Sequence, residues 1–149
     1  MKTKKLIFVV LFLVCAECVG KEDTMLDRLI PALIAVESDG NVDAVGDNGE
    51  AVGILQIHKC VVDDLNIWLA KDEPHYIYAD RFDPHYSKLM CIRYLKHYSR
   101  QYERTTGKHA TLEVLARIWN GGPNGWKKKS TEKYWLKVKK ELVKVEQVK

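Results

Sequence analysis

The sequence predicts a mainly helical protein with one small β or irregular element in its first third. Apolar residues recur at three- and four-residue spacing along most of the chain, which is typical of helices that bury one face. Turn-forming glycine and asparagine residues gather between residues 38 and 53, and strands do not alternate with helices. At 149 residues, the chain is long enough for one domain with its own core.

The first twenty residues have the features of a secretory signal peptide. Three lysines precede an apolar run from Leu6 to Ala16, and the small residue Gly20 stands before the charged Lys21. The run is shorter than the roughly 20 apolar residues that a membrane-spanning helix needs. We expect a secreted or periplasmic protein whose mature domain is residues 21–149, with an uncleaved membrane anchor as the alternative.

Charge and cysteine content limit the function classes. Residues 1–20 contain three lysines and one glutamate, so their removal would lower the formal net charge from +4 to +2. A mildly basic protein of this kind is not expected to bind nucleic acid, which usually requires a strongly basic face. Two cysteines would remain, Cys60 and Cys91. In an oxidising compartment we expect them to form a disulfide, and the alternative is two small buried core residues.

The first two helices are expected on either side of the turn-rich loop. Apolar residues from Met25 to Val36 fall on one helical face, and Pro31 either kinks this helix or starts a second one. An irregular loop or small hairpin should follow between Ser38 and Gly53. A helical run is then plausible from Ile54 to about Leu69.

Three more helices complete the prediction. Asp83 and Pro84 are a typical N-cap and first helical residue, and Gly107 ends that helix. Its inner face should be Cys91, Leu95, Tyr98 and Tyr102. Thr111 caps the next helix, which stops at an Asn-Gly-Gly-Pro sequence. The last helix contains Tyr134 and has apolar residues at helical spacing, with lysines between them on a solvated face.

Three separated segments carry a family resemblance. They are ALIAVES (Ala32–Ser38), GEAVGILQI (Gly49–Ile57) and ARIWNGGPNGW (Ala116–Trp126). Their order and spacing resemble the lytic transglycosylase (SLT domain) family of the lysozyme-like superfamily, whose members carry Glu-Ser, Gly-Leu-Met-Gln-Ile and Tyr-Asn-Ala-Gly stretches. The resemblance covers about residues 25 to 126. It implies a lysozyme-like α+β fold and cleavage of the β-1,4 bond between N-acetylmuramic acid and N-acetylglucosamine in peptidoglycan glycan strands.

The family's catalytic acid maps to Glu37. A leaving sugar oxygen must receive a proton, so the carboxyl group has to stay protonated near neutral pH, and partial burial among apolar groups raises its pKa in that way. By itself, a glutamate at a helix end is more often a solvated surface residue. The resemblance assigns substrate binding to Ser38, Gln56, Trp119, Asn120 and Gly121. Trp119 stands where the family usually has tyrosine, so any hydrogen bond from that hydroxyl to the acid is lost.

The third segment also resembles invertebrate-type lysozymes, which use a second carboxylate on the loop after the glutamate. Asp47 is the nearest match in this sequence. A hydrolase needs such a carboxylate to support the oxocarbenium-like centre. A lytic transglycosylase can use one glutamate, first as acid and then as base toward the sugar's own 6-hydroxyl. The sequence leaves three alternatives open: a lytic transglycosylase, a hydrolytic muramidase, and an inactive wall-binding protein of the same fold.

Cofactors and further partners are not expected. The five histidines show no paired metal spacing such as His-Glu-x-x-His, so no metal is predicted. After signal cleavage the protein should act as a monomer without a membrane partner.

Overall fold

The computed structural model describes residues 24–147. The first helix covers residues 24–37. The elements that follow are β1 (Val45–Gly46), η1 (Asp47–Gly49), β2 (Ala51–Val52), α2 (Lys59–Trp68), η2 (Tyr78–Phe82), α3 (Pro84–Thr106), α4 (Leu112–Gly121), η3 (Gly125–Lys127), η4 (Lys129–Thr131) and α5 (Glu132–Gln147), where η marks a short 3-10 helix. The expected signal peptide lies outside the described residues. Between residues 24 and 147, none of the helices combines the length and apolar character that a membrane span needs.

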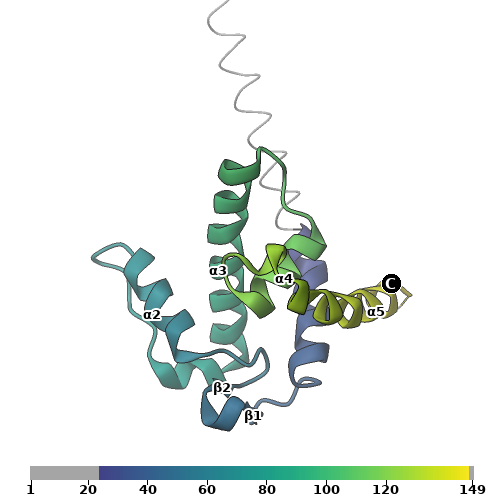
Figure 1. The fold of residues 1–149 in the computed structure, drawn as a ribbon. Coiled ribbons are helices and arrows are strands. Elements are labelled where there is room, and N and C mark those ends of the chain that lie inside the picture. Colours follow the sequence, from purple (N-terminus) through teal and green to yellow (C-terminus); the bar gives the residue numbers. More distant parts are fainter. Residues whose placement is uncertain (1–23, 148–149) are drawn as a thin grey trace, which may run out of the picture.

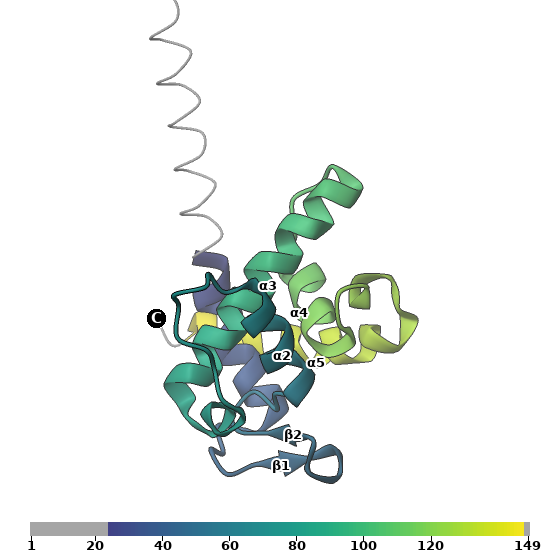
Figure 2. The same ribbon diagram turned by 90° about the vertical axis from the view of Figure 1, so that its left-hand side faces the viewer.

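The mainly helical prediction is confirmed, and the small β element is a two-stranded antiparallel hairpin formed by β1 and β2. The long helix α3 runs through the middle of the molecule, with α2 on one side and the first helix on the other (Figure 1). α2 and α4 both contact α3, and α5 packs on α4. The hairpin lies at one end of the molecule, as the turned view also shows (Figure 2).

The core forms where the first helix, α3 and α4 meet. Its fully buried members include Leu29 and Leu33 from the first helix and Ile118 from α4. The predicted inner face of α3 is confirmed, because Cys91 and Leu95 are fully buried and the remaining two residues pack on the core. The first helix continues through Pro31 without interruption, so it is neither divided nor restarted there.

The predicted helix ends of α3 and α4 are confirmed by their capping contacts. The Asp83 carboxylate accepts hydrogen bonds from the backbone N–H groups of His85 and Tyr86 at 2.8 and 3.1 Å. Gly107 ends α3 in the left-handed conformation with φ 69°. The Thr111 hydroxyl accepts a hydrogen bond from a backbone N–H in the first turn of α4.

The second helix begins later than predicted. It starts at Lys59 rather than Ile54, because the segment before it is folded back as a turn. Gly53 and Gln56 have φ values of 75° and 49°, which an α-helix cannot contain. Ile57 then pairs with Val52 in a β-bridge, so this segment extends the hairpin.

The predicted Cys60–Cys91 disulfide is absent, and both cysteines are free thiols. Cys91 is fully buried in α3, which agrees with the alternative of a small core residue. Cys60 is exposed at the start of α2. Burial raises the pKa of the Cys91 thiol well above its usual value, and the nearby Glu37 carboxylate adds to this effect. The two thiols occupy different environments, one inside the core and one in solvent.

Candidate active site

A buried arginine anchors the hairpin that forms one wall of the site. Arg81 is 4% exposed, and its guanidinium donates hydrogen bonds to the carbonyl oxygens of Glu50 and Ile57 at 3.0 and 2.9 Å. The Arg81 carbonyl in turn lies so close to Gly53 that a Cβ at this position would overlap it. Glycine is therefore required by both the close approach and the positive φ, and the hairpin is held firmly against η2.

Gln56 braces the hairpin from inside. Its side-chain amide donates hydrogen bonds to the carbonyl oxygens of Ala44 and Gly53 at 3.1 and 3.0 Å. These bonds hold Gln56 in its left-handed backbone conformation, which would otherwise be unfavourable for a residue with a side chain. The side chain also lines a cleft that contains Glu37.

Glu37 is the last residue of the first helix, and its carboxylate is partly buried. Its Oε1 accepts a hydrogen bond of 2.6 Å from the Tyr134 hydroxyl of α5. Burial is the largest influence on this group and raises the pKa of Glu37 above its ordinary value. Hydrogen bonding by the Tyr134 and Trp119 side chains partly opposes the rise. The charge of Asp47 also raises the pKa of Glu37, and the charge of His58 lowers it; these are the smallest of the influences.

A cleft of about 300 Å³ opens in front of this carboxyl group. Its lining residues come from the end of the first helix, the hairpin, α2, α3 and α4, and they are Glu37, Asp47, Ala51, Gln56, Ile57, His58, Val61, Tyr94, Trp119 and Asn120. Five of the residues singled out in the sequence thus meet on one cleft: Glu37, Asp47, Gln56, Trp119 and Asn120.

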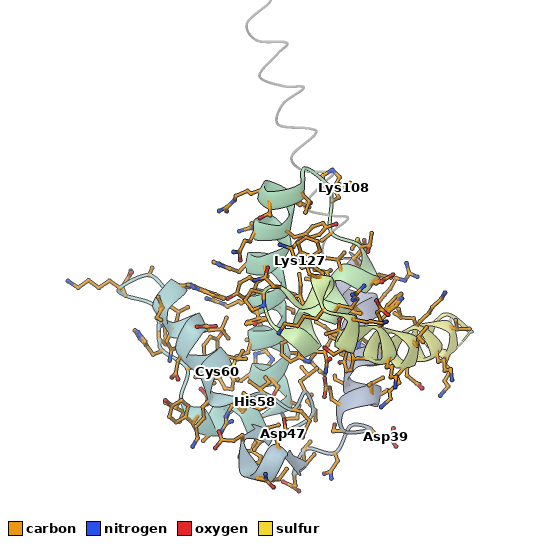
Figure 3. All side chains as sticks on the ribbon, viewed as in Figure 1. Asp39, Asp47, His58, Cys60, Lys108 and Lys127 are labelled. Atoms are coloured by element: carbon orange, nitrogen blue, oxygen red, sulfur yellow. The ribbon has the colours of Figure 1, made fainter. Side chains whose placement is uncertain are left out.

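Asp47 and His58 form a pair at the rim. The His58 Nε2 and Asp47 Oδ2 atoms are 3.0 Å apart, and the two side chains lie together at the hairpin end of the molecule (Figure 3). The Asp47 side chain is 71% exposed, against 42% for His58. Asp47 is therefore largely solvated, in contrast to the partly buried Glu37.

Two predicted substrate-binding residues, Ser38 and Gly121, are not part of the cleft lining. The Ser38 hydroxyl donates a hydrogen bond of 2.9 Å to the Ile54 carbonyl, which ties the end of the first helix to the hairpin segment. The Gly121 carbonyl accepts a hydrogen bond of 2.7 Å from the Lys128 ammonium, and a Cβ at Gly121 would overlap the Thr131 methyl group. In the structure, Ser38 fixes the end of the first helix and Gly121 fixes the end of α4, so both position segments that line the cleft. Direct contact of either residue with substrate stays a prediction.

Tyr134, His58 and Tyr94 were not singled out for the site from the sequence. Tyr134 is separated from Glu37 by 97 residues and appeared only as part of the apolar face of the last helix. Its hydroxyl donates a hydrogen bond to Glu37, although the sequence predicted the loss of such a bond with the replacement of the family's tyrosine by Trp119. No local spacing signals this, since only the docking of α5 on α4 brings the phenol to the carboxylate.

The part of the chain that the structure describes contains no candidate metal site. Between residues 24 and 147, no three side chains of His, Cys, Asp or Glu gather in a way that could hold an ion. The polar residues that line the cleft carry a partly buried carboxyl group, a solvated carboxylate paired with an imidazole, two side-chain amides, a tyrosine hydroxyl and a tryptophan indole.

The comparisons with known proteins agree with this arrangement. The family model described as the Transglycosylase SLT domain matches residues 15–142, so the chain belongs to this family. Over 53 residues it is 40% identical to Lysozyme 1 of Crassostrea virginica, an alignment that covers 35% of this chain and 29% of that protein. The shared stretch is thus less than a third of Lysozyme 1.

A solved structure supports the fold assignment. A chain in the crystal structure of Aeromonas hydrophila PliI in complex with Meretrix lusoria lysozyme is 27% identical to this chain and superposes with a TM-score of 0.60. The match covers 76% of this chain and 87% of the other. The predicted lysozyme-like fold and SLT family membership are confirmed.

Proposed function

We propose that this protein cleaves the β-1,4 bond between N-acetylmuramic acid and N-acetylglucosamine in peptidoglycan, with Glu37 as the general acid. The observation that carries the proposal is a glutamate whose burial raises its pKa, placed on a cleft together with Gln56 and Asn120. Membership of the SLT family supports the same substrate class. The proposal includes export through residues 1–20, because peptidoglycan lies outside the cytoplasmic membrane.

In the first step, the Glu37 carboxyl donates its proton to the glycosidic oxygen as the bond from C1 to that oxygen breaks. The leaving sugar departs with a hydroxyl group, C1 becomes oxocarbenium-like, and Glu37 becomes a carboxylate. Hydrogen bonding by Tyr134 and Trp119 stabilises this carboxylate. Burial raises the pKa of Glu37, so the carboxyl group holds its proton before the step. The hydrogen bonds from the two side chains lower the pKa and so favour release of the proton during the step.

For the second step we propose intramolecular transglycosylation. The Glu37 carboxylate takes the proton of the sugar's 6-hydroxyl while that oxygen bonds to C1, which closes a 1,6-anhydro ring and restores the acid. No water is consumed. The step needs only one partly buried carboxyl group, and Glu37 is that group, whereas Asp47 is largely solvated and paired with His58.

Hydrolysis is the second candidate, and the position of Asp47 favours it. This carboxylate lines the same cleft as Glu37 and acts on its pKa, so it is within electrostatic reach of the reacting centre. In one form of this route, Asp47 would support the oxocarbenium-like C1 while the Glu37 carboxylate takes a proton from the water that bonds to C1, which restores the acid. In the other form, Asp47 would take that proton and release it to solvent, and Glu37 would regain its proton from solvent. The product would then carry an ordinary reducing end.

The test is digestion of purified peptidoglycan, followed by mass spectrometry of the released fragments. We expect wild-type protein to release anhydro products, lighter by one water than reducing-end products, and Glu37→Gln to release none. Glu50→Gln, which changes an exposed glutamate on the hairpin, serves as the matched control and should keep full activity. Products with an ordinary reducing end would show that the second step is hydrolysis and not transglycosylation. If Glu37→Gln releases as many fragments as wild type, Glu37 is not the general acid. If wild-type protein releases no fragments, the protein is not an enzyme on this substrate, and the alternative of a wall-binding protein holds.

A further inference from the structure

A second hollow lies beside the catalytic cleft and shares no lining residue with it. It has a volume of about 400 Å³ and opens between α2, α3 and the loop that follows α4. Its lining residues are Asp64, Trp68, His97, Tyr98, Gln101, Arg104 and Pro123. Three of them, His97, Gln101 and Arg104, follow one another at four- and three-residue spacing on one face of α3. The volume lies within the range of about 300 to 1,000 Å³ usual for small-molecule sites.

Aromatic side chains connect this hollow, hereafter the distal pocket, to the catalytic cleft. Tyr94 lines the catalytic cleft, and its ring lies 5.8 Å from the Trp119 ring in the same cleft. The centre of the Tyr94 ring also lies 4.7 Å from that of Tyr98 and 6.2 Å from that of Trp68, and both of these residues line the distal pocket. A ligand that occupies the catalytic cleft therefore has the distal pocket within reach of its substituents.

Packed aromatic rings form one wall of the distal pocket. The rings of Trp68 and His97 are stacked at 3.7 Å with an angle of 2° between their planes, and the Trp68 ring meets Tyr98 edge to face. Burial lowers the pKa of His97, the positive charges of Arg104 and Arg100 lower it further, and Asp64 opposes them. The lowered pKa favours the neutral form of His97, whose ring stacked on Trp68 offers an aromatic surface.

Opposite charges face the pocket from two different helices. The Arg104 guanidinium comes from α3 and the Asp64 carboxylate from α2, and Gln101 stands three residues before the arginine on the same face of α3. Among residues 24–147, neither charged side chain is taken up by a salt bridge. A pocket with one cation, one anion and an amide is complementary to a ligand that itself carries both charges.

We propose that the distal pocket binds the peptide stem of the glycan strand that occupies the catalytic cleft. This inference rests on the proposed function, because stems are attached to the N-acetylmuramic acid residues of that strand. A stem carries carboxylates and, in its diamino acid, an ammonium group. Arg104 and Gln101 bind a stem carboxylate, Asp64 binds the ammonium, and Trp68 and His97 cover the aliphatic part of the diamino acid.

The experiment compares stem-bearing glycan strands with the same strands after an amidase has removed the stems. Two exposed ion pairs of ordinary strength give a preference for stem-bearing strands of about 5- to 30-fold in kcat/KM. We expect Arg104→Gln and Asp64→Asn each to reduce that preference and to leave the rate on stripped strands unchanged. The control Lys139→Gln, on the exposed surface of α5, should leave both rates unchanged.

Equal kcat/KM on the two substrates for wild type would overturn the inference, and so would variants that slow both substrates alike. Absence of cleavage on either substrate would instead overturn the proposed function. In that case the pocket is tested by titrating a synthetic stem tripeptide into isotope-labelled protein. Shifts of the Trp68 indole and Gln101 amide signals that disappear in Arg104→Gln support the pocket, and unshifted signals in wild type contradict it.

Discussion

The hydrogen bond from the Tyr134 hydroxyl to Glu37 gives the sharpest test of how the acid is tuned. Tyr134→Phe keeps the ring in place and removes one donor at 2.6 Å from the carboxylate. That donor lowers the pKa of Glu37 while burial raises it, and burial is the larger influence. Without the hydroxyl, the pKa of Glu37 should rise further. The alkaline limb of the pH profile of kcat/KM should move to higher pH, because the acid keeps its proton longer.

The free energy of unfolding should change by an amount that depends on pH. A hydrogen bond to a neutral acceptor contributes about 0.5 to 1.5 kcal/mol, and one to a charged acceptor about 1.5 to 3 kcal/mol. Because burial raises the folded-state pKa of Glu37, its stabilising contribution is complete below the unfolded pKa and is lost as pH rises through the folded pKa. We expect Tyr134→Phe to lose about 1 kcal/mol where Glu37 is protonated and about 2 kcal/mol where it is a carboxylate.

Urea unfolding of both proteins on each side of the alkaline limb measures this difference. Tyr86→Phe is the control, because the Tyr86 ring is 43% exposed and packs against Tyr76, and its free energy of unfolding should change by less than about 0.5 kcal/mol at either pH. Equal destabilisation of Tyr134→Phe at both pH values would refute the reasoning. A shift of the alkaline limb to lower pH would refute it as well.

Three further predictions concern the loop and its anchors. Asp47→Asn removes a charge that raises the pKa of Glu37, so the alkaline limb of kcat/KM should move to lower pH, and an unmoved limb would remove Asp47 from the electrostatics of the site. Gly53→Ala should destabilise the fold by about 1 to 3 kcal/mol in urea unfolding, since its φ is positive and a methyl group would meet the Arg81 carbonyl; wild-type stability would show that the hairpin can shift. Ser38→Ala should lose about 1 kcal/mol with an unchanged pH profile, because its hydroxyl donates a hydrogen bond to the Ile54 backbone carbonyl, and a changed profile would contradict that positioning role.

Helix ends were predictable from the sequence where a local contact decides them. Asp83 and Thr111 cap helices through hydrogen bonds to the next turn, so the residues that determine the cap stand beside it in the sequence. The predicted start of α2 was wrong because Gln56 has a positive φ, which an α-helix cannot contain. That conformation depends on hydrogen bonds from its side chain to Ala44, twelve residues away, and helical spacing carries no information about it.

The site could be predicted in part for the same reason. Glu37, Gln56 and Asn120 belong to short segments with recognisable order, and the structure brings them to one cleft. Tyr134 belongs to no such segment, and its contact with Glu37 exists only because α5 docks across the molecule. The disulfide prediction rested on the expected compartment and on cysteine number, and neither determines whether Cys91 is a core residue.

The central claim is that the Glu37 carboxyl keeps its proton at a pH where an ordinary glutamate, with a pKa of about 4.3, has lost it. The most direct measurement follows the chemical shift of the Glu37 side-chain carboxyl carbon against pH in selectively labelled protein. The structure predicts a titration midpoint above the ordinary glutamate value, coinciding with the alkaline limb of kcat/KM. A midpoint at or below the ordinary value would contradict the account.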